Sequence, residues 1–333
     1  MKASTTLACF GSLVVPSTAW YLQVHNQIGY VADQLLNKNT QYMLSQILEP
    51  EYQGSVGRSA AWADTVSRTT APYSYNWHWI SARDNPPDDC GLFYHRDCQQ
   101  GGCVVSQIFN QTEILRPCIA DLAKGQYKPN QTCAQALKWV IHFTMDVCEP
   151  MHTSIRALGG NRFPVTFNGT ETNMHQTWDR WILYAGTNRP NGFADDKIDP
   201  VFQDIYDRIR GEQNGKVGFR EPIKDWAICN WDIERGTYCP EKWAQSSNAI
   251  VCDYAYGRYV NGSDVYKDGY AQGAYHIIDL QLAKAAWRLA GWLNSLASMY
   301  FSQDVAEAED IENPIRGVDA YSGIQQNPLH RDL

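Results

Sequence analysis

The sequence predicts a mostly α-helical protein with a substantial core. Of its 333 residues, 44% are hydrophobic and 12% aromatic, which is enough for one large domain or two small ones. Two long segments, Trp20–Leu48 and Tyr275–Tyr300, carry apolar residues at helical spacing. The clearer of them places these residues on one stripe, interpreted as core: Ile278, Leu282, Ala285, Leu289, Leu293 and Leu296.

The first half of the chain alternates helices with loops that cysteines can close. Trp20–Leu48 is predicted as the first helix and Arg58–Thr69 as the second, followed by an aromatic segment that ends near His78. The prolines and cysteines of Asp84–Gly102 predict a loop. Further helices are predicted at Val104–Leu115 and Ala134–Val147, with a disulfide-tied excursion over Cys118–Cys133.

The second half predicts one strand and four more helices. Arg162–Phe167 alternates apolar and polar residues and ends at the turn signal Asn168-Gly169, as a short strand does. Ser302–Leu333 is polar, acidic and without periodicity, which predicts a disordered tail. Besides Tyr275–Tyr300, helices are predicted at Thr172–Tyr184, Val201–Gly211 and Pro222–Tyr254, the last interrupted by a Cys229–Cys239 loop.

The N-terminus resembles a secretory signal. Lys2 provides the positive charge, Thr6–Val15 a short apolar region, and Ser17-Thr18-Ala19 a cleavage site, so the mature chain is expected to begin at Trp20. No later segment is apolar enough to cross a membrane. Four N-x-S/T sequons are then potential glycosylation sites on surface loops: Asn110, Asn130, Asn168 and Asn261.

Nine cysteines remain after removal of Cys9, and in a secreted protein most of them form disulfides. Three pairs can close short loops, which leaves Cys90 for the distant Cys252. Cys148 is left over, either as a buried free thiol or as an accidental zinc ligand. The expected pairs are Cys90–Cys252, Cys98–Cys103, Cys118–Cys133 and Cys229–Cys239.

The stretch Ile141–Trp181 carries the strongest chemical signal. His142 and Asp146 are four residues apart, as are His175 and Asp179, so in helices each pair lies on one face. One such pair alone is typical of a core histidine beside a surface aspartate. Two pairs with His152 between them favour a Zn²⁺ site, because zinc binds imidazole nitrogen and carboxylate oxygen.

The net charge of −8 excludes the broad cationic surface that grips duplex DNA. If this protein acts on nucleic acid, the local positive charge must come from a cofactor, and a multi-zinc centre supplies it.

With His25, Asp64 and His78 added, the sequence resembles the plant and fungal class I (S1/P1-type) zinc-dependent nuclease family. The resemblance runs from Trp20 to about Tyr300. It rests on Trp20 with His25, Ala63-Asp64, His78, Asp84-Asn85-Pro86-Pro87, Arg96-Asp97-Cys98, His142-Phe143, Asp146, Pro150-Met151-His152, Gly159-Gly160-Asn161, Thr172-Asn173-Met174-His175 and Trp178-Asp179.

The resemblance implies a single multi-helical domain of the S1/P1 nuclease and zinc phospholipase C type, with a short β-hairpin and disulfide-tied loops. The domain would span residues 20–300, between a signal peptide at 1–19 and a tail at 301–333. It implies three zinc ions. One would be held by Asp64, His78, His142 and Asp146, a second by His152, His175 and Asp179, and a third by the backbone of Trp20, His25 and Asp146.

The implied function is a secreted endonuclease, in the extracellular space or an acidic vacuolar or lysosomal compartment. It would cut single-stranded DNA and RNA to 5′-phosphate products through a metal-activated water and would also hydrolyse 3′-nucleotides. A monomer is expected. The resemblance gives catalytic roles to Asp64, Arg68 and Asp146, and substrate contacts to Trp79, on which a base would stack, Ser81 and Asn173.

The sequence departs from the family's pattern at four positions. Met145 and Glu149 stand where the family usually has glycine and glutamine. Ser67 occupies the place of a basic residue that contacts the phosphate, so Arg68 is the candidate substitute, against a plain surface arginine. Ser81 stands where a carboxylate often reads the base.

Two other functions compete with the nuclease. A zinc phospholipase C shares the fold and a related ligand set, but the Asp84–Pro87 block favours the nuclease. A non-catalytic binding glycoprotein is disfavoured because all nine ligand positions are intact.

Overall fold

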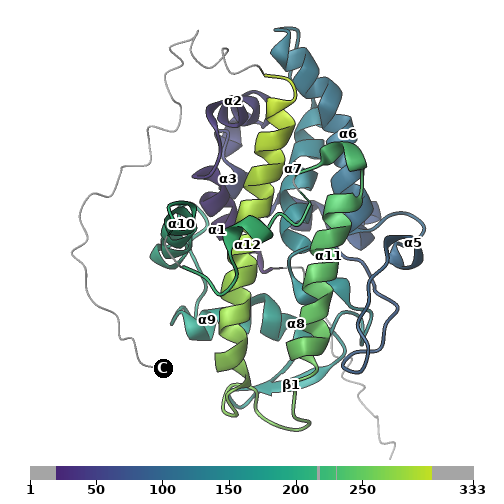
Figure 1. Ribbon diagram of the computed structural model, residues 1–333, viewed down its shortest axis with the longest axis vertical. Coiled ribbons are helices and arrows are strands. Elements are labelled where there is room, and N and C mark those ends of the chain that lie inside the picture. Colours follow the sequence, from purple (N-terminus) through teal and green to yellow (C-terminus); the bar gives the residue numbers. More distant parts are fainter. Residues whose placement is uncertain (1–19, 216–217, 230, 302–333) are drawn as a thin grey trace, which may run out of the picture.

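The long C-terminal helix α12 (Tyr270–Ser298) forms the axis of the molecule. The computed structural model describes residues 20–215, 218–229 and 231–301. In Figure 1, α12 runs along most of the molecule between two groups of helices. It packs against α1, α2, α7, α9 and α10, and its predicted apolar stripe is buried. The predicted mostly helical class is therefore confirmed.

The other helices surround this axis, and most of them lie where the sequence predicts a helix. Their bounds are α1 Leu22–Asp33, α2 Lys38–Ile47, α3 Val56–Ser59, α4 Trp62–Ser67, α5 Tyr94–Asp97, α6 Val104–Ala123, α7 Gln131–Asp146, α8 Met174–Gln176, α9 Ile182–Gly186, α10 Pro200–Gln213 and α11 Tyr238–Ile250. Short 3₁₀ turns lie at Pro50–Tyr52, Pro72–His78, Pro150–Thr153, Ile223–Asp225 and Ile233–Arg235, and π-helical turns at Thr177–Trp181 and Val251–Ala255.

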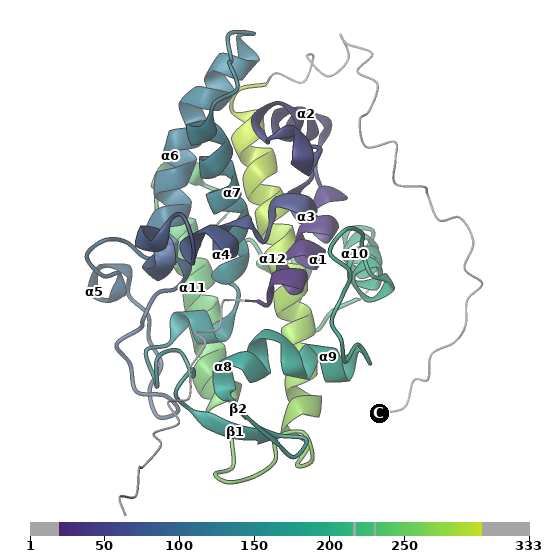
Figure 2. The same cartoon turned by 180° about the vertical axis from the view of Figure 1, so that it is seen from behind.

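The single sheet of the described residues is a hairpin at one end of the molecule. Strand β1 (Pro164–Phe167) and the turn at Asn168-Gly169 lie where the strand and turn signals predict them. The antiparallel partner β2 (Thr170–Asn173) includes Thr172 and Asn173, which the sequence predicts as the start of a helix. Figure 2 shows the hairpin beneath α8 and α9. Because β2 continues directly into α8, the hairpin fixes the start of the helical segment that carries His175.

Several predicted boundaries were wrong. The predicted helix Trp20–Leu48 is two helices, because Asn37 accepts a hydrogen bond from the Thr40 N–H and caps α2. Pro117 does not end α6, which continues to Ala123. A proline removes one helical hydrogen bond, but the packing of α6 along α7 and the Cys118–Cys133 disulfide hold the helix end in place.

Other predicted elements also differ from the structure. The predicted loop Asp84–Gly102 contains the short helix α5, and the predicted helix Pro222–Tyr254 is regular only from Tyr238. The predicted signal peptide and C-terminal tail lie outside the described residues. Within those residues, no helix has the length and apolar character needed to cross a bilayer.

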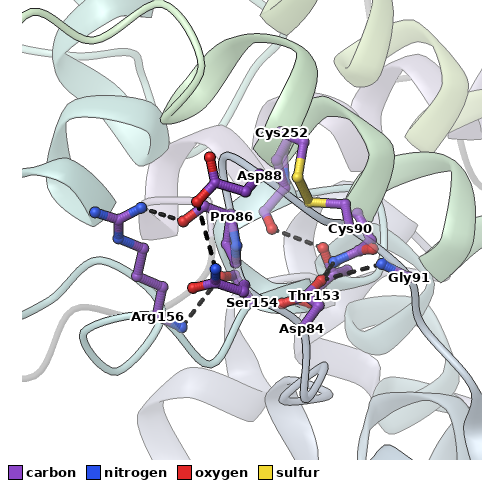
Figure 3. Close-up of a disulfide and its surroundings, with 12 residues drawn as sticks. Asp84, Pro86, Asp88, Cys90, Gly91, Thr153, Ser154, Arg156 and Cys252 are labelled. Carbon is purple, nitrogen blue, oxygen red and sulfur yellow. Dashed lines mark hydrogen bonds between the residues drawn. A yellow bond between two sulfur atoms is a disulfide. The ribbon is translucent and has the colours of Figure 1, made fainter.

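Four disulfides join the pairs that the cysteine spacing predicts: Cys90–Cys252, Cys98–Cys103, Cys118–Cys133 and Cys229–Cys239. The first ties the Asp84–Gly91 loop to the turn after α11 (Figure 3). Around it, Asp84 accepts hydrogen bonds from Asn248 and from the Gly91 N–H, and Arg156 donates to the Pro86 carbonyl. The loop is therefore fixed against the segment that follows His152.

Removing the Cys90–Cys252 bond by alanine substitution is expected to lower the free energy of unfolding by about 5 kcal/mol. The bond closes a loop with a sequence separation of 162, and longer loops lose more entropy on closure. The Cys98–Cys103 pair, with a separation of 5, is the matched control, and its removal is expected to cost about 2 kcal/mol. Denaturant titration of both variants measures the difference, and equal losses would contradict the loop-entropy account.

Candidate metal centre

Eight histidine and aspartate side chains from distant parts of the chain meet in the interior. Each is at most 4% exposed. They come from α1, α4, α7, α8 and the turns beside them: His25, Asp64, His78, His142, Asp146, His152, His175 and Asp179. They form three groups, in each of which potential ligand atoms lie within 4.8 Å of one another. The i,i+4 pairs on α7 and on the α8 segment provide four of the eight.

Asp146 lies between two of these groups. One of its oxygens is 3.0 Å from His25 Nε2, and the other is 3.0 Å from His78 Nδ1 and 3.2 Å from His142 Nε2. Asp64 faces the same imidazoles, with Oδ1 3.7 Å from both His78 Nδ1 and His142 Nε2. A carboxylate in this position can contribute one oxygen to each of two cations.

The third group is built by His152, His175 and Asp179. His175 Nε2 lies 3.3 Å from Asp179 Oδ2, and the rings of His152 and His175 have centroids 5.1 Å apart. Trp20 is fully buried, and the Tyr21 N–H lies 3.5 Å from the Asp179 carbonyl. The start of the predicted mature chain is therefore placed beside this group.

Backbone carbonyls orient three of the imidazoles. The Nδ1 atoms of His142, His152 and His175 lie 2.7, 2.6 and 2.6 Å from carbonyl oxygens. A carbonyl only accepts, so each Nδ1 must carry the proton, and in a neutral imidazole the Nε2 is then left with its lone pair. This is the arrangement that metal-binding histidines adopt in proteins. The three carbonyls belong to Ala60, His78 and Gly159.

The backbone conformation of Gly159 explains why its own carbonyl can contact His175 Nδ1. Its φ of +60° lies in the left-handed region. A Cβ at this position would lie 2.8 Å from the Met151 carbonyl oxygen, so a larger residue would displace the loop. The Gly159-Gly160 turn of the sequence is thus part of the support for the site.

The buried carboxylates of the centre suit bound cations. Among the described residues, none of Asp64, Asp146 and Asp179 forms an ion pair with lysine or arginine. Burial and the adjacent Glu149 raise the pKa of Asp179 well above its usual range. Buried carboxylates are costly unless they are paired with positive charge or bind metal, and this donor set can do the latter.

Buried polar atoms without a hydrogen-bond partner in the same cluster support the presence of a metal site. Within the described residues, both Asp64 carboxylate oxygens, Asp179 Oδ1 and His152 Nε2 are buried without a hydrogen-bond partner. Burial lowers the pKa of His152 to about 4, so its imidazole is neutral. Neutral imidazole nitrogen and carboxylate oxygen are both zinc ligands, so the residues fit the metal.

The predicted substrate residues lie outside this buried cluster. The Trp79 ring is edge-on to the His152 ring, 6.4 Å away, at the border of the centre. Ser81 follows Ile80, whose N–H donates to the His152 carbonyl. The Asn173 side-chain oxygen accepts the Gln176 N–H and caps α8, a structural task that the sequence did not predict.

The basic position three residues after Asp64 differs from the expected pattern. Ser67 is buried, and its hydroxyl donates to the Asp64 carbonyl. Arg68 is exposed at the C-terminal end of α4 and is not part of the buried cluster. Cys148, whose role the sequence left open, is a buried free cysteine whose sulfur lies 3.3 Å from the Arg288 guanidinium.

Glu149 is a participant that the sequence did not assign to the site. It is fully buried, and its Oε2 accepts the His152 N–H at 2.9 Å. Burial raises the pKa of Glu149 well above its usual range. The three carbonyls were also missed, because a backbone oxygen has no signature in the sequence.

Replacing Glu149 with glutamine is therefore expected to leave metal content and activity essentially unchanged, because an amide oxygen can accept the same N–H. Glu149→Leu instead removes the carboxyl acceptor and leaves the buried His152 N–H only the backbone carbonyl of residue 149, 3.2 Å away, so it is expected to destabilise the protein by about 1 kcal/mol. Thermal unfolding and metal analysis of the two variants test this. A large loss of metal in the glutamine variant would show that the carboxyl group itself is needed.

The comparison with known proteins agrees with this geometry. The S1/P1 Nuclease family matches residues 20–298. Nuclease S1 of Aspergillus oryzae is 32% identical over 279 residues, covering 82% of this chain and 90% of that protein. Nuclease P1 of Penicillium citrinum is 29% identical over 281 residues (83% and 97%), and Endonuclease 3 of Arabidopsis thaliana is 26% identical over 292 residues (86% and 92%). The chain therefore belongs to the S1/P1 nuclease family and is a phosphodiester hydrolase.

Proposed function

We propose that this protein is a zinc-dependent endonuclease. It hydrolyses phosphodiester bonds of single-stranded DNA and RNA to 5′-phosphate products and also removes phosphate from 3′-nucleotides. The observation that carries the proposal is the buried cluster of eight histidines and aspartates. Backbone carbonyls orient three of its imidazoles, and its carboxylates form no ion pair with lysine or arginine among the described residues. Family membership and relatives named as nucleases support the same substrate class.

Three zinc ions account for all nine proposed ligands. Asp64, His78, His142 and Asp146 would hold the first. The second would be held by His152, His175 and Asp179. The third would take the α-amine and carbonyl of Trp20 together with His25 and the second oxygen of Asp146. The position of Asp146 between its neighbours supports this sharing.

Zinc ions bound here supply Lewis-acid stabilisation of a phosphate and lower the pKa of water at neutral pH. The protein's own residues do the rest. The backbone carbonyls keep three imidazoles in the metal-binding tautomer. Trp79, at the border of the centre, offers a ring on which an unpaired base can stack, which favours single strands. The exposed Arg68 is proposed to contact the phosphate.

We propose secretion as the route by which the chain matures. Its four disulfides fit an oxidising compartment, and the predicted signal at residues 1–19 supplies the targeting. Glycosylation at the four sequons and a monomeric state belong to the same proposal.

Chelation is expected to abolish cleavage and to release the bound metal. The measurement is metal content by mass spectrometry with activity on single- and double-stranded DNA and RNA, before and after chelation. Re-addition of zinc should restore activity, and the affinity should fall in acid because protons compete for the histidines. Metal-free protein that cleaves at the full rate would contradict the proposal.

The same preparation separates the competing functions. Release of 5′-phosphate nucleotides from single strands identifies a nuclease, and release of phosphate from a 3′-nucleotide identifies the second activity. Hydrolysis of phosphatidylcholine without action on nucleic acid would identify a phospholipase C. Zinc-loaded protein inactive on all three substrates would identify a binding protein.

A further inference from the structure

A groove on the hairpin end of the molecule has none of the proposed metal ligands in its lining. It has a volume of about 450 Å³, within the roughly 300–1,000 Å³ typical of ligand sites. The hairpin strands and the α8–α9 segment form its walls, and these elements lie side by side in Figure 2. Aromatic rings and planar amides line it, among them Phe167, Gln176, Trp181, Tyr184, Asn188 and Tyr266.

The wall of this groove contains its own attachment point for a ligand. Asn168 and Thr170, the first and third residues of a sequon, both line the groove. Both are exposed, so the site is open to solvent. The asparagine is held in place, because Asp264 accepts the Asn168 N–H at 2.8 Å and the Gly169 N–H at 2.7 Å. A group attached here would therefore start at the edge of the groove.

The lining suits a carbohydrate. The C–H faces of a pyranose ring pack against aromatic rings, and its hydroxyl and acetamido groups hydrogen-bond to side-chain amides and carboxylates. Phe167 and Tyr266 are adjacent, with ring centroids 5.3 Å apart, and Tyr266 is 46% exposed. Gln176 and Asn188 offer amides, and Glu171 offers a carboxylate. An aromatic surface of this kind would otherwise face water.

We propose that Asn168 carries an N-linked glycan whose first N-acetylglucosamine units fold back into this groove. The glycan covers the exposed ring of Tyr266 and the half-buried rings of Phe167 and Trp181, fastens the hairpin to α9 and closes the groove to other ligands. The inference rests on the secretory route proposed above, which exposes the sequon to glycosylation, and it does not depend on the proposed nuclease reaction.

The test compares Thr170→Ser, which keeps the sequon, with Thr170→Ala, which destroys it. Both are produced in a glycosylating secretory host, and glycopeptide mass spectrometry reports occupancy. We expect an occupied Asn168, and a lower melting temperature for the alanine variant than for the serine variant. The two variants should melt alike when they are made without glycosylation. An unmodified Asn168 in secreted wild-type protein would overturn the proposal.

Enzymatic trimming distinguishes a docked glycan from a free one. In the native protein, an endoglycosidase should trim the Asn168 glycan at least about tenfold more slowly than the glycan on the exposed Asn261, because a docked core must first open. Tyr266→Ala should bring the two rates together. Equal rates in the wild type would mean that the glycan projects into solvent and that the groove is left for another occupant, such as a nucleobase.

Discussion

Replacing Asp146 with asparagine is expected to lower single-strand cleavage by at least about 10³-fold, more than the roughly 10- to 100-fold loss caused by changing an outer partner of a metal ligand. Asp146 is fully buried, with one oxygen toward His25 and the other toward His78 and His142. Asparagine keeps the shape but replaces one oxygen with an amide nitrogen, which does not bind a cation. The bridge is therefore broken: one of the two proposed zinc sites loses its oxygen ligand, and the other keeps only a neutral amide oxygen in place of a carboxylate.

The measurement is zinc content and cleavage rate of the purified variant, with circular dichroism to verify the fold. Asp121→Asn, the same substitution at an exposed position of α6, is the matched control and should keep three zinc ions and the wild-type rate. An Asp146 variant with full zinc content but no activity would mean that the carboxylate acts on the substrate instead of holding metal. Full activity would remove Asp146 from the centre altogether.

The cluster could be predicted because its ligands carry chemistry in their side chains. His142 with Asp146, and His175 with Asp179, share a helix face by spacing alone. His25 lies 121 residues before Asp146, and no local pattern connects the two. Its assignment came from the resemblance to a known family, and the structure brings the two side chains together.

The groups that hold the metal-binding side chains in place could not be predicted in the same way. The carbonyls of Ala60 and Gly159 that orient His142 and His175 depend on the path of the backbone, which side-chain identity does not specify. In the sequence, Glu149 stands out only as a departure from the glutamine of the family, and its contact with the His152 N–H depends on its burial beside that residue. Helix ends failed for a related reason: the helix predicted at Val104–Leu115 continues past Pro117 to Ala123, where packing along α7 and the Cys118–Cys133 disulfide hold it.

Retention of Ala19 in the mature chain is expected to remove one of the three zinc ions and to lower activity at least about 100-fold, the upper end of the loss from an outer-partner change. The proposed third site uses the free α-amine of Trp20. An additional residue converts this amine into an amide, whose nitrogen lone pair is delocalised into the carbonyl and does not bind metal.

Two chains that differ only in their first residue provide the measurement. One is cleaved from a fusion so that it begins at Trp20, and the other so that it begins at Ala19. Zinc content and cleavage rate are compared, and removal of the alanine by an aminopeptidase should restore both. Three zinc ions and full activity in the longer chain would show that the amine is not a ligand.

The position of Trp20 allows a control that separates the role of its α-amine as a zinc ligand from the role of its side chain in packing. Trp20→Phe keeps the amine and loses part of a fully buried side chain, so it should lower stability while retaining the third zinc ion. Acetylation of the Trp20 amine does the reverse, since it adds few atoms and removes the donor. If zinc is lost on acetylation and kept in the phenylalanine variant, the amine is the ligand. The opposite pattern would mean that the indole ring shapes the site and that metal binding needs no free chain end.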